Sequence, residues 1–131
     1  MENRQLKFRA WDAQEKQMIS PDYITRTGYA FWKENSIPTS SNVIMQSTGL
    51  KDKNNTEIYE GDILKLVSLD PSYPLDDELQ EVKYDPYNNG YPAFDLVPGD
   101  LQDECNNLQL VIQGDYTCEV VGNIYQKPEL L

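Results

Sequence analysis

The sequence contains no histidine and only two cysteines among its 131 residues. Histidine is the commonest general base, a frequent neutral metal ligand and the partner of Ser and Cys in nucleophile pairs. Its absence excludes most hydrolase mechanisms in their usual form. Cys105 and Cys118 have no CxxC spacing and no ligand cluster beside them, so we expect two reduced thiols and no metal site.

Long apolar runs are also missing. No stretch approaches the roughly twenty apolar residues that a membrane-spanning helix needs. The first residues, Met1 to Trp11, lack the apolar core of a secretion signal. We therefore expect a cytoplasmic protein without a membrane partner.

Basic residues are scarce, with 11 Lys and Arg against 22 Asp and Glu and a net charge of −11. Binding to nucleic acid requires cations that neutralise phosphates, so direct binding to nucleic acid is not expected. The scattered Gly, Pro, Asn and Asp residues, together with nine Tyr, favour short strands and turns. The composition predicts one mainly β protein with little helix.

The central stretch from Thr48 to Leu66 organises this prediction. Residues that tolerate positive φ or bond to their own backbone occur at Gly49, in the cluster Asp52–Asn55 and at Gly61 with Asp62. Strand formers lie between and after them, at Glu57–Tyr59 and Ile63–Val67. The pattern predicts a turn, a strand, a tight turn and a second strand, with Gly122 as a further turn residue.

Alternation of apolar and polar residues predicts the remaining strands. An N-terminal hairpin is expected from Leu6–Trp11 and Gln17–Ile19, while Tyr23–Ile24 fits a capped helical turn. A dense turn cluster between two alternating segments predicts the clearest hairpin. This hairpin pairs Glu81–Tyr84 with Tyr91–Val97. A short polar helix fits Leu101–Asn107. Further strands are expected at Val43–Gln46, Leu108–Gln113 and Tyr116–Val121.

The most linker-like segment is Asn35–Asn42, which is rich in Ser, Asn and Pro. A subdomain boundary is predicted there, giving an N-terminal hairpin or irregular subdomain of residues 1–42 and a C-terminal β-barrel subdomain of residues 43–131. Just before it, Tyr29–Trp32 places three large rings in four residues. They fit either a stacking platform or the core of a small β domain, and the core interpretation is favoured.

The strongest candidate for a chemically active site is a group of carboxylates around the central turn and after it. They are suited to holding Mg²⁺ or Ca²⁺ only if several converge, and their spacing does not match an EF-hand loop. In a chain this acidic, a solvated surface explains such clustering, and Asp62 has a structural explanation as a turn residue. The residues are Glu57, Glu60, Asp62, Asp76, Asp77, Glu78 and Glu81.

Three segments resemble the YopX family of phage and prophage proteins. They are Leu6–Asp12, the stretch from Thr48 through Leu64, and Glu119–Leu131, which together span nearly the whole chain. The sequence departs from the family pattern at Ser47, where an aromatic residue is common, and at Asn54-Asn55, where Asn-Gly is usual. The resemblance implies an irregular β-rich N-terminal part, a small antiparallel SH3-like β-barrel and homo-oligomers, and it carries over no catalytic residue.

Three functions remain open. The first is a non-enzymatic, phage- or prophage-encoded protein in the host cytoplasm, which assembles with itself and binds a host or phage protein without a cofactor. Aromatic residues concentrate binding energy at interfaces, so its candidate interaction residues are Trp11, Trp32, Tyr59 and Tyr125. The alternatives are an acidic DNA mimic that inhibits a nucleic-acid-binding host protein and a metal-dependent enzyme that uses only carboxylates.

Overall fold

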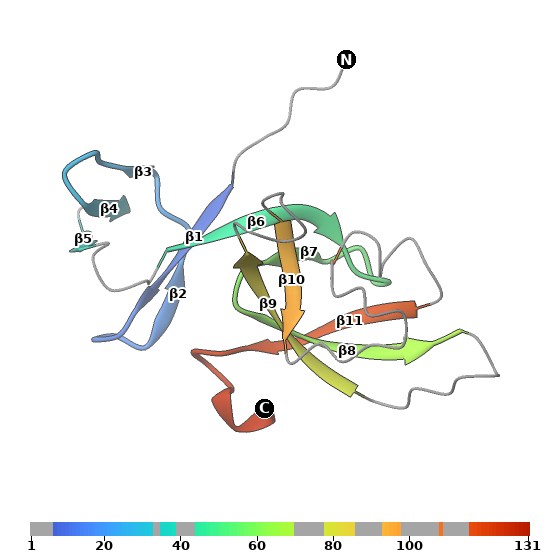
Figure 1. The fold of residues 1–131 in the computed structure, drawn as a ribbon. Coiled ribbons are helices and arrows are strands. Elements are labelled where there is room, and N and C mark those ends of the chain that lie inside the picture. The colour runs from blue at the N-terminus through green and yellow to red at the C-terminus, as the bar shows by residue number, and fades with distance from the viewer. Residues whose placement is uncertain are drawn as a thin grey trace, which may run out of the picture. The chain divides into compact units, whose positions relative to one another are not determined.

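The computed structural model describes residues 7–32, 35–38, 44–69, 78–85, 93–97, 108 and 116–131. Within these residues it contains eleven β-strands, one short 3-10 helix, Pro128–Leu130, and a single helical residue at position 108, so the predicted mainly β fold is confirmed (Figure 1). The chain divides into two compact units, residues 1–47 and 48–131. None of the described helical residues forms a helix long and apolar enough to cross a membrane.

The first unit begins with the predicted hairpin. Strand β1 (Phe8–Asp12) pairs antiparallel with β2 (Gln17–Ile19), which places Trp11 opposite Met18. The buried Asp12 closes the turn, because its Oδ1 accepts hydrogen bonds from the backbone N–H groups of the second and third residues after it, at 3.0 and 3.3 Å. On its other edge β1 pairs with β6 (Ile44–Lys51), with Phe8 opposite Gln46.

A three-stranded antiparallel sheet completes this unit, in the order β3 (Tyr23–Ile24), β4 (Tyr29–Trp32) and β5 (Asn35–Pro38). Two expectations were wrong here. Tyr23–Ile24 is a strand rather than a helical turn, because β4 satisfies the backbone groups on both sides of it, with Asp22 N–H and Thr25 N–H each donating at 2.7 Å. The first half of the predicted linker is strand β5, since its backbone pairs with β4; residues 39–42 lie outside the described residues.

Strand β6 continues from the first unit into the second. The predicted strand at Val43–Gln46 is extended through Gly49, which was expected to reverse the chain and instead lies within β6. Gly49 has a φ of 78°, which lies in a backbone region that glycine adopts readily. Beside it, Thr48 Oγ1 donates to Ile58 O at 2.8 Å and joins β6 to β7 (Glu57–Tyr59).

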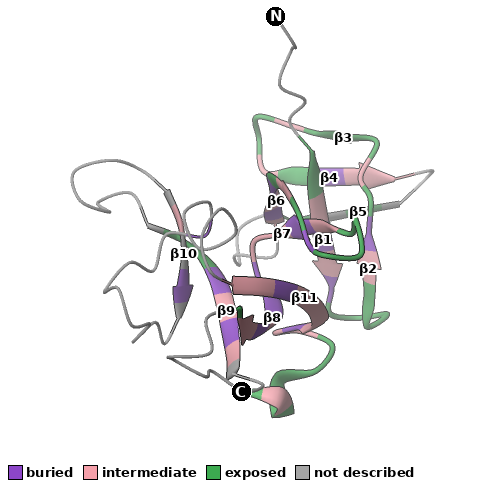
Figure 2. Cartoon of the chain, turned by 90° about the vertical axis from the view of Figure 1, so that its right-hand side faces the viewer, coloured by how far each residue is buried: buried purple, intermediate pink, exposed green. Residues whose placement is uncertain are grey.

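The second unit contains a four-stranded antiparallel sheet in the order β10, β9, β8 and β11. The sheet curls into a half-barrel, and buried residues line β8 and β9 (Figure 2). The predicted hairpin is confirmed, with Leu96 opposite Val82 across β9 and β10. The bounds are β8 (Asp62–Ser68), β9 (Glu78–Asp85), β10 (Ala93–Val97) and β11 (Tyr116–Asn123).

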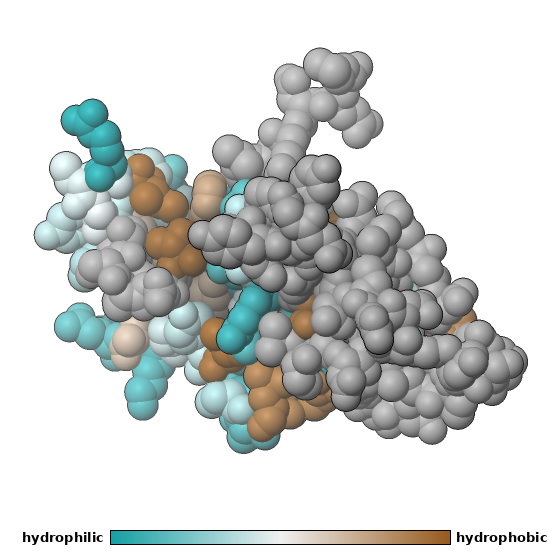
Figure 3. Space-filling model, viewed as in Figure 1, coloured by the Kyte–Doolittle hydropathy of each residue, from teal (hydrophilic) through white to brown (hydrophobic). Residues whose placement is uncertain are grey.

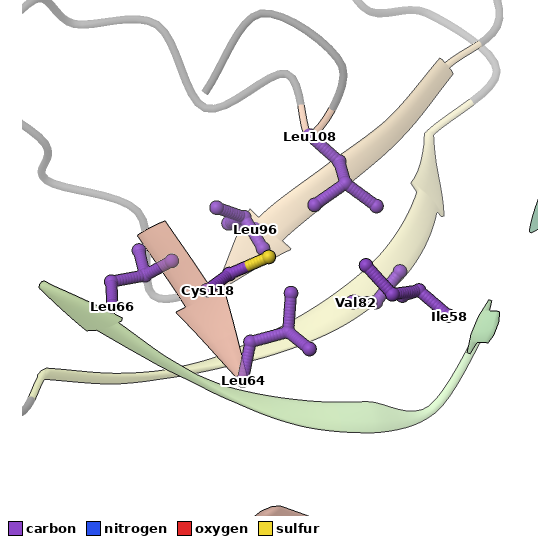
Figure 4. Packing of buried hydrophobic residues seen from close by; sticks show 7 residues of the cluster. All are labelled: Ile58, Leu64, Leu66, Val82, Leu96, Leu108 and Cys118. Atoms are coloured by element: carbon purple, nitrogen blue, oxygen red, sulfur yellow. The ribbon is translucent and has the colours of Figure 1, made fainter. Parts of the chain in front are cut away.

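The core of this unit lies on the concave side of the curled sheet. Seven buried residues pack together there, six aliphatic side chains and one thiol (Figure 4). Leu108 belongs to this cluster and is helical, although a strand was predicted to begin at it; the rest of the expected helix and strand at 101–113 lies outside the described residues. The seven are Ile58, Leu64, Leu66, Val82, Leu96, Leu108 and Cys118.

Candidate functional site

The central turn is built around the buried carboxylate of Asp52. Its Oδ1 accepts from the backbone N–H groups of Asn54 at 2.9 Å and Thr56 at 2.8 Å, and its Oδ2 accepts from Val120 N–H at 2.8 Å. Burial by itself would raise the pKa of Asp52, but these three donors outweigh that effect and hold the pKa below its ordinary value. The carboxylate therefore fixes the turn and attaches it to β11.

The tight turn between β7 and β8 has a similar anchor. The buried Asp62 accepts a hydrogen bond from Tyr59 N–H at 2.7 Å through Oδ2. Gly61 takes a positive φ of 87°, its N–H donates to Val82 O at 2.8 Å, and its carbonyl accepts from Ile124 N–H at 3.0 Å. The turn thus connects β9 to the chain that follows β11.

The prediction of a turn at Gly122 was wrong, because this residue, like Gly49, lies within a strand. It lies inside β11, where the pairing with β8 shifts register after Val120. A Cβ atom at this position would come within 3.1 Å of Leu130 Cδ1 and of Lys127 Cδ. The missing side chain therefore allows the C-terminal segment to pass close to the strand.

The acidic residues of the central stretch are spread over several elements. Among the described residues, no three His, Cys, Asp or Glu side chains gather as a metal-binding group. Burial raises the pKa of Glu81, although nearby Lys83 opposes the shift. Asp76 and Asp77 lie outside the described residues, as does the side chain of Glu78.

Of the two cysteines, Cys118 is a buried free thiol in the core cluster. Burial, and secondarily the carboxylate of Asp52, raises the pKa of this thiol to about 11. Because the thiolate is the reactive form, Cys118 is poorly suited to nucleophilic chemistry. Cys105 lies outside the described residues.

The four aromatic residues predicted for protein interaction are all partly buried. Trp11 and Trp32 lie in the first unit, on β1 and β4. In the second unit, Tyr59 Oη donates to Glu57 Oε2 at 3.4 Å. Burial raises the pKa of Tyr125, and the carboxylates of Glu60 and Glu81 add to the shift. Their role in binding stays a prediction.

The more exposed aromatic residues lie elsewhere in the first unit. Tyr23 is 59% exposed and Tyr29 is 45% exposed, and β3 lies at the surface (Figure 2). The core interpretation of the aromatic run therefore fails for Tyr29, and sequence reasoning missed Tyr23. A signal was present in the sequence, because most of the residues near Tyr23 along the chain are polar, among them Asp22, Thr25 and Arg26.

These rings form a row along one side of the three-stranded sheet. Tyr23 and Phe31 face each other across β3 and β4, with stacked rings whose centroids are 5.0 Å apart. Tyr29 lies two residues before Phe31 on the same side, with its ring tilted and 6.4 Å away. The exposed Ser36 and Pro38 are opposite Phe31 and Tyr29 in β5. We call this set, Tyr23, Tyr29, Phe31, Ser36 and Pro38, the aromatic face.

Charge is divided unevenly between the two units. Residues 1–47 contain six Lys and Arg and five Asp and Glu, which gives +1. Residues 48–131 contain five Lys and Arg and 17 Asp and Glu, which gives −12. The acidity of the chain therefore belongs to the second unit, and the aromatic face lies in the nearly neutral one.

The fold and these surfaces define a small mainly β protein, in which a curled antiparallel half-barrel follows a smaller β-rich unit. The chain belongs to the YopX protein family, whose model matches residues 7–131.

Two solved structures have a similar fold, each with a TM-score of 0.60. Protein EF1440 from Enterococcus faecalis is 31% identical, and the match covers 98% of this chain and 99% of that one. The protein yopX from Bacillus subtilis is 25% identical, with 95% and 97% covered. No curated protein matches the sequence.

Proposed function

We propose that this chain is a non-enzymatic interaction protein, encoded by a phage or prophage, that assembles with copies of itself and binds a host or phage protein in the host cytoplasm. The observation that carries the proposal is the aromatic face. Exposed Tyr23 and Tyr29 lie beside partly buried Phe31, in the unit that has almost no net charge. Tyrosine is enriched among the residues that dominate binding energy at protein interfaces.

The use of the polar groups in the central stretch supports this proposal. Asp52 and Asp62 accept backbone hydrogen bonds, and Gly49 and Gly61 adopt backbone conformations that favour glycine. These residues stabilise turns and strand ends, so their presence needs no catalytic explanation. Interfaces that bind proteins use exposed aromatic side chains, and the first unit offers these.

Affinity capture from a lysate of the host, combined with light scattering on the purified chain, tests both halves of the proposal. We expect a mass above that of the monomer at concentrations approaching 1 mM, and a captured protein that the double variant Tyr23→Thr/Tyr29→Thr no longer retains. If the wild-type chain stays monomeric at every concentration and captures the same proteins as the double variant, the proposal is contradicted.

The charge of −12 on the second unit favours one other candidate, an acidic mimic of DNA. Such a protein occupies the basic surface of a nucleic-acid-binding partner, and its complex weakens steeply with salt. If this function is correct, duplex DNA should displace a captured partner from the immobilised chain, and the loss of the two tyrosines should have no effect on capture. Retention of the partner in excess DNA would argue against the mimic.

A further inference from the structure

We propose that the central turn, residues 52–56, covers the outer edge of strand β11 and thereby prevents a strand of another chain from adding to the half-barrel at this edge. Such a role is independent of the binding proposed for the aromatic face. It gives the carboxylate of Asp52 a use beyond its own turn, because one of its oxygens takes the place that a backbone carbonyl has in a neighbouring strand.

Strand β11 is at one end of the described four-stranded sheet, next to β8. In an antiparallel strand, successive residues direct their backbone N–H and C=O groups to opposite sides. The side of β11 that faces away from β8 is therefore a row of donors and acceptors to which a strand of another molecule can bond. The hazard is considerable here, because β11 has eight residues and contains the β-favouring run from Tyr116 to Val121.

The central turn bonds to two backbone groups on this outer side. Cys118 O accepts from Lys53 N–H at 3.0 Å, and Val120 N–H donates to Asp52 Oδ2 at 2.8 Å. A C=O and the N–H of the second residue after it are the groups that an adjacent antiparallel strand would bond. The partner of Cys118 is a backbone N–H, as in a normal ladder, whereas the partner of Val120 is a carboxylate oxygen. An incoming strand would therefore find both groups already bonded.

Side chains add to this cover. Glu119 lies between the two bonded residues of β11, with its Oε2 atom 3.6 Å from Lys53 Nζ and its Oε1 atom 3.5 Å from Asn54 Nδ2. A lysine at a strand edge is one of the devices by which natural proteins discourage strand addition. The turn is closed at its base by Asp52 N–H, which donates to Thr56 O at 2.9 Å. Its ends continue into β6 and β7, so the cover is held on both sides.

The variant Asp52→Asn separates the cover from the local turn. Asparagine keeps one oxygen to accept from Asn54 and Thr56, but it places an NH₂ group opposite Val120 N–H, so that two donors face each other. We expect the Val120 amide to exchange with solvent about tenfold faster than in wild type, as measured by NMR. The Glu119 amide points towards β8 and should keep its protection. Unchanged exchange at Val120 would overturn the proposal.

A second variant, Lys53→Pro, opens the edge without changing Asp52. Asn55 N–H donates to Asp52 O at 3.0 Å, which makes Lys53 the second residue of a β-turn. Proline is favoured at this position, so the turn should form, but proline has no N–H to donate to Cys118 O. If one of the two edge variants does not fold, as judged by circular dichroism, the other one decides the test.

Association through the opened edge is measured by thioflavin T fluorescence and light scattering at about 100 µM protein, well below the melting temperature of each chain. We expect both edge variants to form β-rich assemblies about tenfold faster than wild type. Gly61→Val is the matched control, because it strains the same unit and leaves the contacts of Asp52 and Lys53 with β11 in place. It should associate more slowly than either edge variant of equal melting temperature.

Exposed apolar side chains provide another route to association. Hydrophobic side chains reach the surface at several places, where they are brown in Figure 3. The exposed ones include Ile24, Leu69 and Leu131. All the variants retain these residues, so association through them would not distinguish the edge variants from Gly61→Val. Rates that follow the melting temperature alone, or edge variants that associate no faster than wild type, would overturn the proposal.

Discussion

The Oδ2 atom of Asp52 lies 2.8 Å from the backbone nitrogen of Val120, 68 residues further along the chain, and accepts its hydrogen bond. The other carboxylate oxygen stays within the local turn, where it accepts from Asn54 and Thr56. Lys53 N–H in turn donates to Cys118 O at 3.0 Å. One side chain thus links a local reversal of the chain to a distant strand of the half-barrel.

Replacing Asp52 by alanine should lower the free energy of unfolding by about 2–3 kcal/mol. The reason is that three backbone donors, on Asn54, Thr56 and Val120, lose their acceptor in a partly buried site. Urea denaturation followed by circular dichroism measures this loss. The neighbouring Lys53→Ala is the control, because its exposed ion pair with Glu119, at 3.6 Å, should contribute less than about 1 kcal/mol. Equal losses in both variants would show that the carboxylate does not hold the turn.

The pH dependence of the free energy of unfolding should also reveal the role of Asp52. The folded-state pKa of Asp52 lies below its ordinary 3.8, because the backbone donors outweigh the effect of burial. A depressed pKa stabilises the fold above the unfolded-state value, and this contribution is lost as the pH falls through the folded-state value. Asp52→Asn should therefore flatten the loss of stability below about pH 4. Thermal melts at intervals between pH 7 and pH 2.5 measure it, and parallel curves for variant and wild type would contradict the assignment.

Gly61→Val should destabilise the second unit by about 1–3 kcal/mol, because a β-branched residue is strained at positive φ. The φ of Gly61 is 87°, and its backbone bonds to both Val82 and Ile124 leave little freedom to relax. Gly61→Asn is the matched variant, since asparagine tolerates this region better, and its loss should be smaller. A melting temperature for Gly61→Val equal to that of wild type would mean that the turn has been misread.

The thiol of Cys118 should react with a thiol reagent only after the chain opens. With a pKa of about 11, on the order of one such thiol in a thousand is ionised at pH 8, and the side chain is buried in the core. The measurement uses a Cys105→Ser variant, so that a single thiol reports. We expect slow labelling in buffer and fast labelling in 6 M urea. Fast labelling of the folded variant would show that the half-barrel exposes this position.

Local patterns predicted much of the strand content. The alternation in β1 and in the hairpin of β9 with β10 reflects side chains buried on one face, because such burial leaves a period of two in the sequence. Strand β8 was predicted instead from an apolar run, and successive residues at its start are buried. Short elements without such a pattern were harder to predict. Tyr23–Ile24 has only two residues, and Asn35–Pro38 has the composition of a linker, so their strand structure depends on the backbone of β4.

The candidate surface was harder still to predict. Trp11 and Trp32 were predicted as interaction residues because they are aromatic. The exposure of an aromatic ring, however, depends on which neighbouring side chains cover it. Tyr29 and Trp32 belong to the same strand and face opposite sides, and only the first is strongly exposed. The uneven charge was present in the sequence but became visible only when the structure divided the chain at Ser47 and Thr48.

The sequence by itself determined the fold class, the turns at Asp52–Asn55 and at Gly61 with Asp62, and the family, because these depend on short patterns of glycine, aspartate and alternating apolar residues. Only the tertiary structure decided that Asp52 bonds to β11, that Gly122 allows the C-terminal segment to pass, and that Tyr23 stacks on Phe31. Each of these contacts joins residues that are separated along the chain. Their geometry follows from strand pairing and register, and local sequence does not specify either.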